Sequence, residues 1–162
     1  MRIAILSDTH GDHAMVARAL NLLQSRRIER ILHCGDIDDS LTIQLFAGTP
    51  TDFVLGNCDQ QPSLLAHAAE LAGAKLHGRF ADLTLGGKRI AMIHGDDKKA
   101  MEKAEKSGVY DFLFYGHTHV AEQHQTGKTT VLNPGALHRA RPKTLAILDL
   151  ETSALETVIV SE

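Results

Sequence analysis

Short apolar runs that end in Asp, Asn or His recur along this chain, and this recurrence most limits what it can fold into. The first run, residues 2–6, passes directly into Ser-Asp-Thr-His-Gly, so Asp8 and His10 follow a predicted buried strand. Four later runs are followed in the same way by Asp36, Asn57, His94, and the pair His117 and His119. In the first half these runs alternate with helical patterns, which predicts parallel strands and an α/β fold.

The spacing of apolar residues and turn residues predicts the individual elements. Asp12 is expected to cap a helix, and Gly86-Gly87 is expected to close a hairpin because glycine adopts positive φ angles readily. The other expected strands are 31–32, 53–55, 79–85, 88–93, 112–115, 120–125, 130–132, 145–150 and 155–160, with helices at about 40–46 and 98–106. No linker or repeat interrupts this pattern, so residues 1–162 are predicted to form one domain with two packed sheets.

Composition excludes several classes of protein. No apolar run approaches the roughly 18 residues of a membrane span, and the first apolar run is too short for a signal peptide. The net charge of −3 gives no strong nucleic-acid or membrane signal. Two cysteines do not make a disulfide framework. The prediction is a cytoplasmic protein with a small-molecule partner, and the sequence leaves a homo-oligomer open.

The polar loops are expected to meet, because ligands gather at the carboxyl ends of strands in α/β sheets. Each residue taken singly has a structural explanation: Asp8 as a helix cap, Asn57 as a turn residue, His94 as a half-buried hydrogen-bonded imidazole. His117 and His119 are two positions apart, so in an extended chain they would point the same way. Five such loops together favour a shared site over five separate structural roles.

Clustered carboxylates repel one another unless a cation lies between them, and neutral His and Asn beside them indicate a divalent ion. The predicted ligands are Asp8, His10, Asp36, Asn57, His94, His117 and His119. Seven ligands are too many for one tetrahedral zinc and suit two ions that share a carboxylate. Without a thiolate, the set suits manganese first, with iron, zinc or nickel as alternatives.

The blocks Asp8-Thr-His10, Gly35-Asp36, Gly56-Asn-Cys-Asp59, His94-Gly and Gly116-His-Thr-His119 occur in this order along the chain. This series resembles the calcineurin-like metallophosphoesterase superfamily, and the short length resembles its small YfcE-like phosphodiesterase branch. The resemblance runs from Asp8 to Asn133-Pro-Gly135 and so covers nearly the whole chain. It implies a fold of two mixed β-sheets packed face to face with helices on the outside.

The resemblance also implies how the ligands divide. Asp8, His10, Asp36 and His119 would hold one ion, and Asp36, Asn57, His94 and His117 the other, with Asp36 bridging. The implied activity is hydrolysis of a phosphodiester through attack by a metal-bridging hydroxide. An alternative is a protein-binding scaffold of the same fold with little catalysis. A nuclease would predict a longer chain and a basic groove, which neither the length nor the charge supports.

Four further residues are assigned to the substrate or to the support of the ligands: Asp12, Cys58, Asp59 and Asn133. Many relatives carry a histidine, interpreted as a general acid, where this chain has Cys58. Three roles stay open for Cys58: a nucleophile, a metal ligand, or a small residue lining the site. The third is preferred, because the imidazoles that would activate a thiol bind metal and because adjacent residues of an extended chain point opposite ways. Without an imidazole acid, the site should favour diesters with acidic leaving groups.

Overall fold

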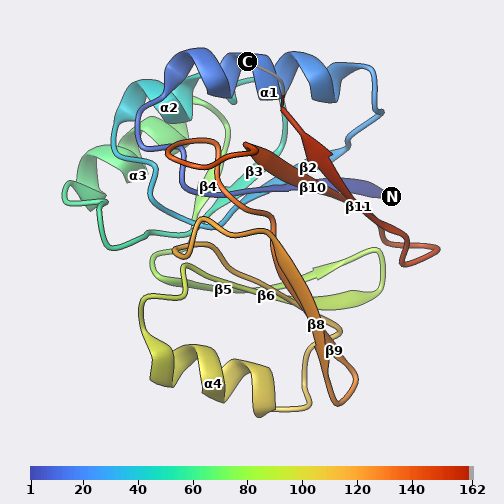
Figure 1. The fold of residues 1–162 in the computed structure, drawn as a ribbon. Helices are drawn as coiled ribbons and strands as arrows, with labels where there is room; N and C mark the ends of the chain where they lie inside the picture. The colour runs from blue at the N-terminus through green and yellow to red at the C-terminus, as the bar shows by residue number, and fades with distance from the viewer. Residues whose placement is uncertain (161–162) are drawn as a thin grey trace.

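The computed structural model describes residues 1–160 and arranges them in four layers, helix, sheet, sheet and helix (Figure 1). In chain order the elements are β1 (Arg2–Leu6), α1 (His13–Gln24), β2 (Arg30–His33), α2 (Ser40–Gln44), β3 (Thr51–Phe53), α3 (Pro62–Leu71), β4 (Lys75–Leu76), β5 (Phe80–Leu85), β6 (Lys88–Ile93), α4 (Lys98–Lys106), β7 (Phe112–Phe114), β8 (Glu122–Thr126), β9 (Thr129–Asn133), β10 (Thr144–Asp149) and β11 (Leu155–Ile159).

The strands form two mixed sheets. The first has the order β11-β10-β1-β2-β3-β4, in which β1 to β4 run parallel and β10 pairs antiparallel with β1. The second has the order β5-β6-β7-β9-β8, with β6, β7 and β9 parallel and an antiparallel strand at each edge. Parallel strands at the centre of each sheet therefore direct their carboxyl ends, and the loops that follow, to one edge of that sheet.

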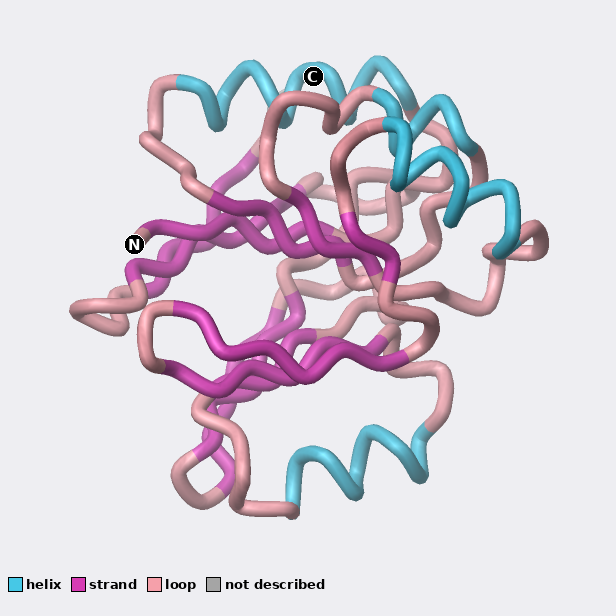
Figure 2. Tube along the Cα trace, turned by 180° about the vertical axis from the view of Figure 1, so that it is seen from behind, coloured by secondary structure: helices cyan, strands magenta, loops and turns pink. Residues whose placement is uncertain are grey.

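The two-residue period of the strands explains why the sheets pack face to face. In β1, Ile3 and Ile5 point to the second sheet, whereas Ala4 and Leu6 point to the helices α1 to α3. The outer face of the second sheet packs on α4 in the same way. Burying a side chain such as Ile5 contributes roughly 1.5–3 kcal/mol. The predicted sandwich with helices outside is confirmed, and Figure 2 shows the two sheets edge-on between the helices.

Most predicted elements are present with small shifts of their ends. The Asp12 side chain caps α1, since its carboxylate accepts from the Met15 N–H at 3.1 Å, and Gly86 and Gly87 both have positive φ in the hairpin turn. The third strand begins two residues earlier than predicted. Within residues 1–160 no helix is both long enough and apolar enough to cross a membrane.

Helix α3 and strand β4 were not predicted from the sequence. The helix was readable in principle, because Pro62 occupies its first turn and Leu65, Ala68 and Ala69 are buried at helical spacing. The strand β4 has only two residues, too few for a period to show. It extends the first sheet beside β3.

Candidate metal centre

The five polar loops meet at the carboxyl ends of the parallel strands, and they bring all seven predicted ligands to one place. Asp8 and His10 follow β1, Asp36 follows β2, Asn57 follows β3, His94 follows β6, and His117 and His119 follow β7. Ligand-type atoms within 4.8 Å of one another form overlapping groups: Asp8 with His10 and His119, and Asp8 with Asp36 and His94. One continuous cluster therefore spans both sheets.

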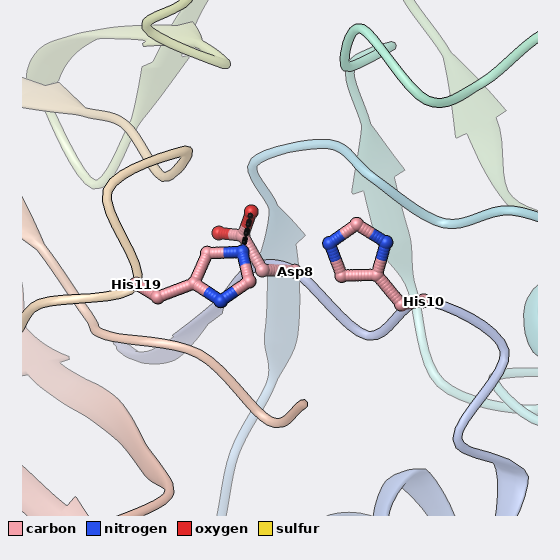
Figure 3. A group of neighbouring side chains, drawn as sticks. All are labelled: Asp8, His10 and His119. Carbon is pink, nitrogen blue, oxygen red and sulfur yellow. Dashed lines mark ion pairs between the residues drawn. The ribbon is translucent and has the colours of Figure 1, made fainter. Parts of the chain in front are cut away.

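The first part of the cluster contains Asp8, His10 and His119 (Figure 3). His119 Nε2 lies 3.2 Å from Asp8 Oδ1, and the rings of His10 and His119 lie 5.4 Å apart between centroids. Asp8 is buried, and both of its carboxylate oxygens accept from the His117 N–H at 3.3 and 3.1 Å. The loop after β7 is thereby fixed to the loop after β1.

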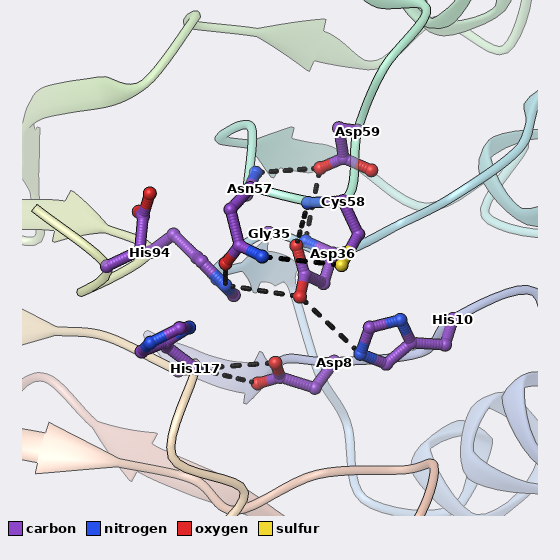
Figure 4. Close-up of polar contacts among 12 residues, drawn as sticks. Asp8, His10, Gly35, Asp36, Asn57, Cys58, Asp59, His94 and His117 are labelled. Carbon is purple, nitrogen blue, oxygen red and sulfur yellow. Dashed lines mark hydrogen bonds and ion pairs between the residues drawn. The ribbon is translucent and has the colours of Figure 1, made fainter.

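The second part surrounds Asp36 and His94 (Figure 4). Asp36 Oδ2 lies 3.3 Å from His94 Nε2 and 3.4 Å from His10 Nε2, so this carboxylate stands between the two parts. Asn57 Oδ1 lies 3.1 Å from His94 Nε2, and the His117 ring lies 5.2 Å from the His94 ring. Asp36 therefore contacts a histidine of each part of the cluster.

These residues fit divalent ions by distance and by donor type. Two ligands bound about 2.1 Å from one octahedral ion lie roughly 3 Å apart, close to the observed 3.2–3.4 Å between imidazole nitrogens and carboxylate oxygens. His94 Nδ1 donates to the Cys34 carbonyl at 2.8 Å, which leaves the Nε2 lone pair directed at oxygens of Asp36 and Asn57. With His94 neutral, these three atoms are all acceptors, and a bound cation would satisfy them.

The ionisation of the central groups reflects the same convergence. Burial raises the pKa of Asp8. Burial also opposes ionisation of Asp36, but hydrogen bonds from His94 and from the Cys58 backbone N–H outweigh it and hold the pKa of Asp36 below its usual range. Burial lowers the pKa of His94, but the Asp36 carboxylate more than compensates and the net shift is upward.

Five of the seven residues have the left-handed backbone that side chains other than glycine rarely adopt. The φ angles are +54° for Asp8, +44° for His10, +56° for Asp36, +69° for His117 and +60° for His119. Such conformations cost of order 1–3 kcal/mol each and concentrate at functional sites. The extended chain assumed for the two histidines of the β7 loop was therefore wrong. Their rings diverge instead, one beside His94 and the other beside His10.

Asp59 supports the loops after β2 and β3 through backbone hydrogen bonds. Its buried carboxylate accepts from four backbone N–H groups, those of Asp36, Ile37, Asp38 and Gly56, at 2.7–3.1 Å. Asp59 joins the loop after β2 to the loop after β3.

Asn133 and Asp12 likewise contact the ligand loops indirectly. The buried Asn133 amide donates to the Gly116 carbonyl at 2.7 Å and to Thr118 Oγ1 at 3.0 Å, so it shapes the loop that carries the last two histidines. Asp12 Oδ2 lies 3.4 Å from His138 Nδ1, and the His138 ring lies 5.6 Å from the His10 ring.

Two neighbours of the cluster, His138 and Arg79, were not predicted from the sequence. The backbone N–H of His138 donates to the Asp8 carbonyl at 3.1 Å. Arg79 received no role, but its guanidinium donates to the Gly56 carbonyl at 3.3 Å and pairs with Asp96, which follows His94 by two residues. The position of His138 soon after Asn133-Pro-Gly was a usable signal. No pattern in the sequence pointed to Arg79.

Cys58 lies at the mouth of the cluster and is partly exposed, whereas Cys34 is buried and neither forms a disulfide. The Cys58 sulfur lies within 4.8 Å of ligand atoms of His10 and Asp36. The expectation that Cys58 points away from Asn57 was wrong, because β3 ends at Phe53 and the chain bends before these residues. Burial and the Asp36 charge raise the pKa of the ion-free thiol to about 11.

Comparisons with known proteins agree with this geometry. The model of the calcineurin-like phosphoesterase superfamily domain matches residues 1–153. Phosphodiesterase MJ0936 of Methanocaldococcus jannaschii is 26% identical over 99% of both chains. The probable metallophosphoesterase YsnB of Bacillus subtilis is 28% identical over 95% of this chain and 87% of its own length. The solved structure of an archaeal phosphodiesterase superposes with a TM-score of 0.92 at 26% identity, covering 98% of this chain and 99% of that one.

Proposed function

Because the chain belongs to the calcineurin-like phosphoesterase superfamily, we propose that it is a phosphodiesterase with a centre of two divalent ions. Membership in the family supports hydrolysis of phosphoric esters, and the archaeal phosphodiesterase at 26% identity over nearly the full length supports a diester substrate. The observation that carries the proposal is the position of Asp36, 3.3 Å from His94 and 3.4 Å from His10. A carboxylate that contacts two groups of ligand-type residues can be shared by a pair of ions.

The proposed ligands divide between the two ions by the contacts described above. Asp8, His10, Asp36 and His119 hold the first ion, and Asp36, Asn57, His94 and His117 hold the second. Manganese is the proposed ion, with iron, zinc or nickel as alternatives, because oxygen and imidazole ligands predominate. When bound, the ions supply Lewis acidity that makes water nucleophilic at neutral pH and neutralises the phosphate oxygens.

The chain itself contributes a rigid and correctly protonated ligand set. The Cys34 carbonyl fixes the His94 tautomer with Nδ1 as the donor, so Nε2 is free to bind. Asp59 and Asn133 hold the loops through backbone contacts, so the ligand atoms need little rearrangement. No imidazole stands at position 58, and the preferred substrates are therefore diesters whose leaving groups depart without protonation.

Ion analysis combined with an assay panel tests this proposal. We expect about two tightly bound divalent ions per chain, and hydrolysis that chelation abolishes and Mn²⁺ restores. Turnover should fall as the leaving-group pKa rises across a series of diesters, and monoesters of the same alcohols should be slower. Fewer than about one ion per chain with no metal-stimulated hydrolysis would replace this proposal with the protein-binding scaffold.

A further inference from the structure

We propose that Cys58 is itself a metal ligand, which joins His10 and Asp36 at the first ion. This inference rests on the two-ion centre proposed above. Its basis is geometric: the Cys58 sulfur, a ring nitrogen of His10 and a carboxylate oxygen of Asp36 all lie within 4.8 Å of one another. The same spacing relates Asp8, His10 and His119, the other ligands of that ion.

The backbone around position 58 directs the sulfur into the centre. The Cys58 N–H donates to Asp36 Oδ1 at 2.9 Å, which places residue 58 over the bridging carboxylate (Figure 4). The other Asp36 oxygen, Oδ2, faces the imidazoles of His10 and His94. One carboxylate therefore anchors the cysteine through one oxygen and faces the ion positions with the other.

Asn57 orients the sulfur from the other side. Its amide Nδ2 donates to Cys58 Sγ at 3.4 Å, while its Oδ1 lies 3.1 Å from His94 Nε2. The two adjacent side chains thus serve different ions, Asn57 Oδ1 the second and Cys58 Sγ the first. A sulfur that already accepts a hydrogen bond is directed as a thiolate ligand would be.

Binding through Cys58 has a defined chemistry. As the metal–sulfur bond forms, the S–H bond breaks and its proton passes to solvent, so the ligand is a thiolate. Thiolate favours zinc over manganese, because it is a softer donor than carboxylate or water. Cys34 provides the internal comparison: it is buried, and only its backbone carbonyl takes part, as the acceptor for His94.

Cobalt(II) substitution of the intact protein tests the assignment without relying on activity. We expect two bound cobalt ions per chain and a near-ultraviolet thiolate-to-cobalt charge-transfer absorption. Both Cys58→Ser and Cys58→Ala should lose this absorption and keep the visible bands of cobalt bound to imidazole and carboxylate. Cys34→Ala should keep both, and circular dichroism of each variant establishes that it is folded.

Competition between zinc and manganese provides a second measurement. Cys58→Ser should lower zinc affinity by at least about tenfold, because even the loss of a residue that only hydrogen-bonds to a metal ligand typically lowers metal affinity by that much. Manganese affinity should change much less. Two bound cobalt ions without the charge-transfer band would overturn the Cys58 assignment and leave the two-ion centre standing. A band that survives both Cys58 variants would overturn it too. Failure of the chain to bind cobalt would overturn the two-ion centre and, with it, this assignment.

Discussion

The turns at the two ends of the second sheet place the same demand on the backbone and meet it with different residues. At the amino end of β6, the hairpin turn has φ angles of +53° and +75°, at Gly86 and Gly87. After the carboxyl end of β7, left-handed positions are again required, and φ is +69° at His117 and +60° at His119. Glycine adopts these angles without strain, whereas residues with a Cβ lose of order 1–2 kcal/mol at each.

A residue other than glycine at a left-handed position indicates that its side chain is needed there. A hairpin turn needs only a backbone shape, so the residue that fits that shape best is present. The ligand loops need imidazole and carboxylate atoms at defined points, and the chain accepts backbone strain to place them. Ion binding would stabilise the folded chain by more free energy than the backbone strain costs. We call the carboxyl ends of the parallel strands, with the loops that carry the proposed metal ligands, the ligand edge, and the opposite end with the Gly86-Gly87 turn the turn edge. Changes at the ligand edge should alter ion binding. Changes at the turn edge should alter only stability.

The largest effect is expected at Asp36, whose carboxylate lies between His10 and His94. Asp36→Asn removes the charge shared by both proposed ions, and several kcal/mol of transition-state stabilisation should disappear with it, about 10³-fold in kcat/KM. Isothermal titration with Mn²⁺ should show loss of tight binding. Asp82→Asn, at a surface position paired with Arg89, is the control and should bind normally. Retention of two tight ions by Asp36→Asn would exclude the bridging role.

The ligand edge also contains a buried imidazole, His33, at the carboxyl end of β2. His33 is fully buried beside Thr9, and burial, reinforced by the charge on His94, lowers its pKa from 6.5 to about 3. Between these values the unfolded chain binds a proton that the folded chain does not. Stability should therefore rise with pH from about 3 to 6.5 and then level off, by up to about 5 kcal/mol.

The variant His33→Gln should flatten this dependence in ion-free protein, as measured by urea unfolding across that pH range. His67→Gln, an exposed position on α3, should leave the slope as in the natural chain. Identical slopes for all three proteins would show that His33 takes up a proton in the folded state without penalty.

The meeting of the polar loops could be predicted from the sequence because each loop depends on a local pattern: an apolar strand followed by Asp, Asn or His. The same reasoning failed where contacts join distant segments. The four backbone bonds accepted by Asp59 depend on how the loops after β2 and β3 meet, and no spacing within either loop encodes that. Arg79 reaches Gly56 and Asp96 for the same reason.

Loop conformation limited the prediction in a second way. Side chains alternate with a period of two only within strands. Extending this rule past the end of β3 predicts that Cys58 points away from the centre, but the chain bends there and Cys58 points toward it. The same rule also treated the residues from His117 to His119 as extended, although both histidines are left-handed. Side-chain direction in such loops is set by tertiary hydrogen bonds, here by Asp36 and Asp8.

Two glycine substitutions of intermediate effect sharpen the contrast between the edges. A Cβ on Gly56 would lie 2.1 Å from Asp36 Oδ1 and 2.4 Å from Asp36 N, whereas a Cβ on Gly87 meets no atom within 4 Å. Gly56→Ala should cost about 1–3 kcal/mol and weaken ion binding, because the Asp36 carboxylate must move. Gly87→Ala should cost about 1–2 kcal/mol through φ alone, with ion binding unchanged. Equal ion affinities in the two variants would contradict the distinction.

The smallest effect is also the most specific. His117 is exposed and has a φ of +69°, so His117→Gly should raise the stability of the ion-free protein by about 1 kcal/mol, as measured by urea unfolding with chelator present. His124→Gly, in the extended strand β8, should lower it by roughly 0.5–1 kcal/mol. With Mn²⁺ added, the order should reverse, because only the first variant loses a proposed ligand. If His117→Gly instead destabilised the ion-free protein, contacts of the His117 side chain would stabilise the fold by more than the left-handed backbone costs. The strain argument would then be wrong at this position.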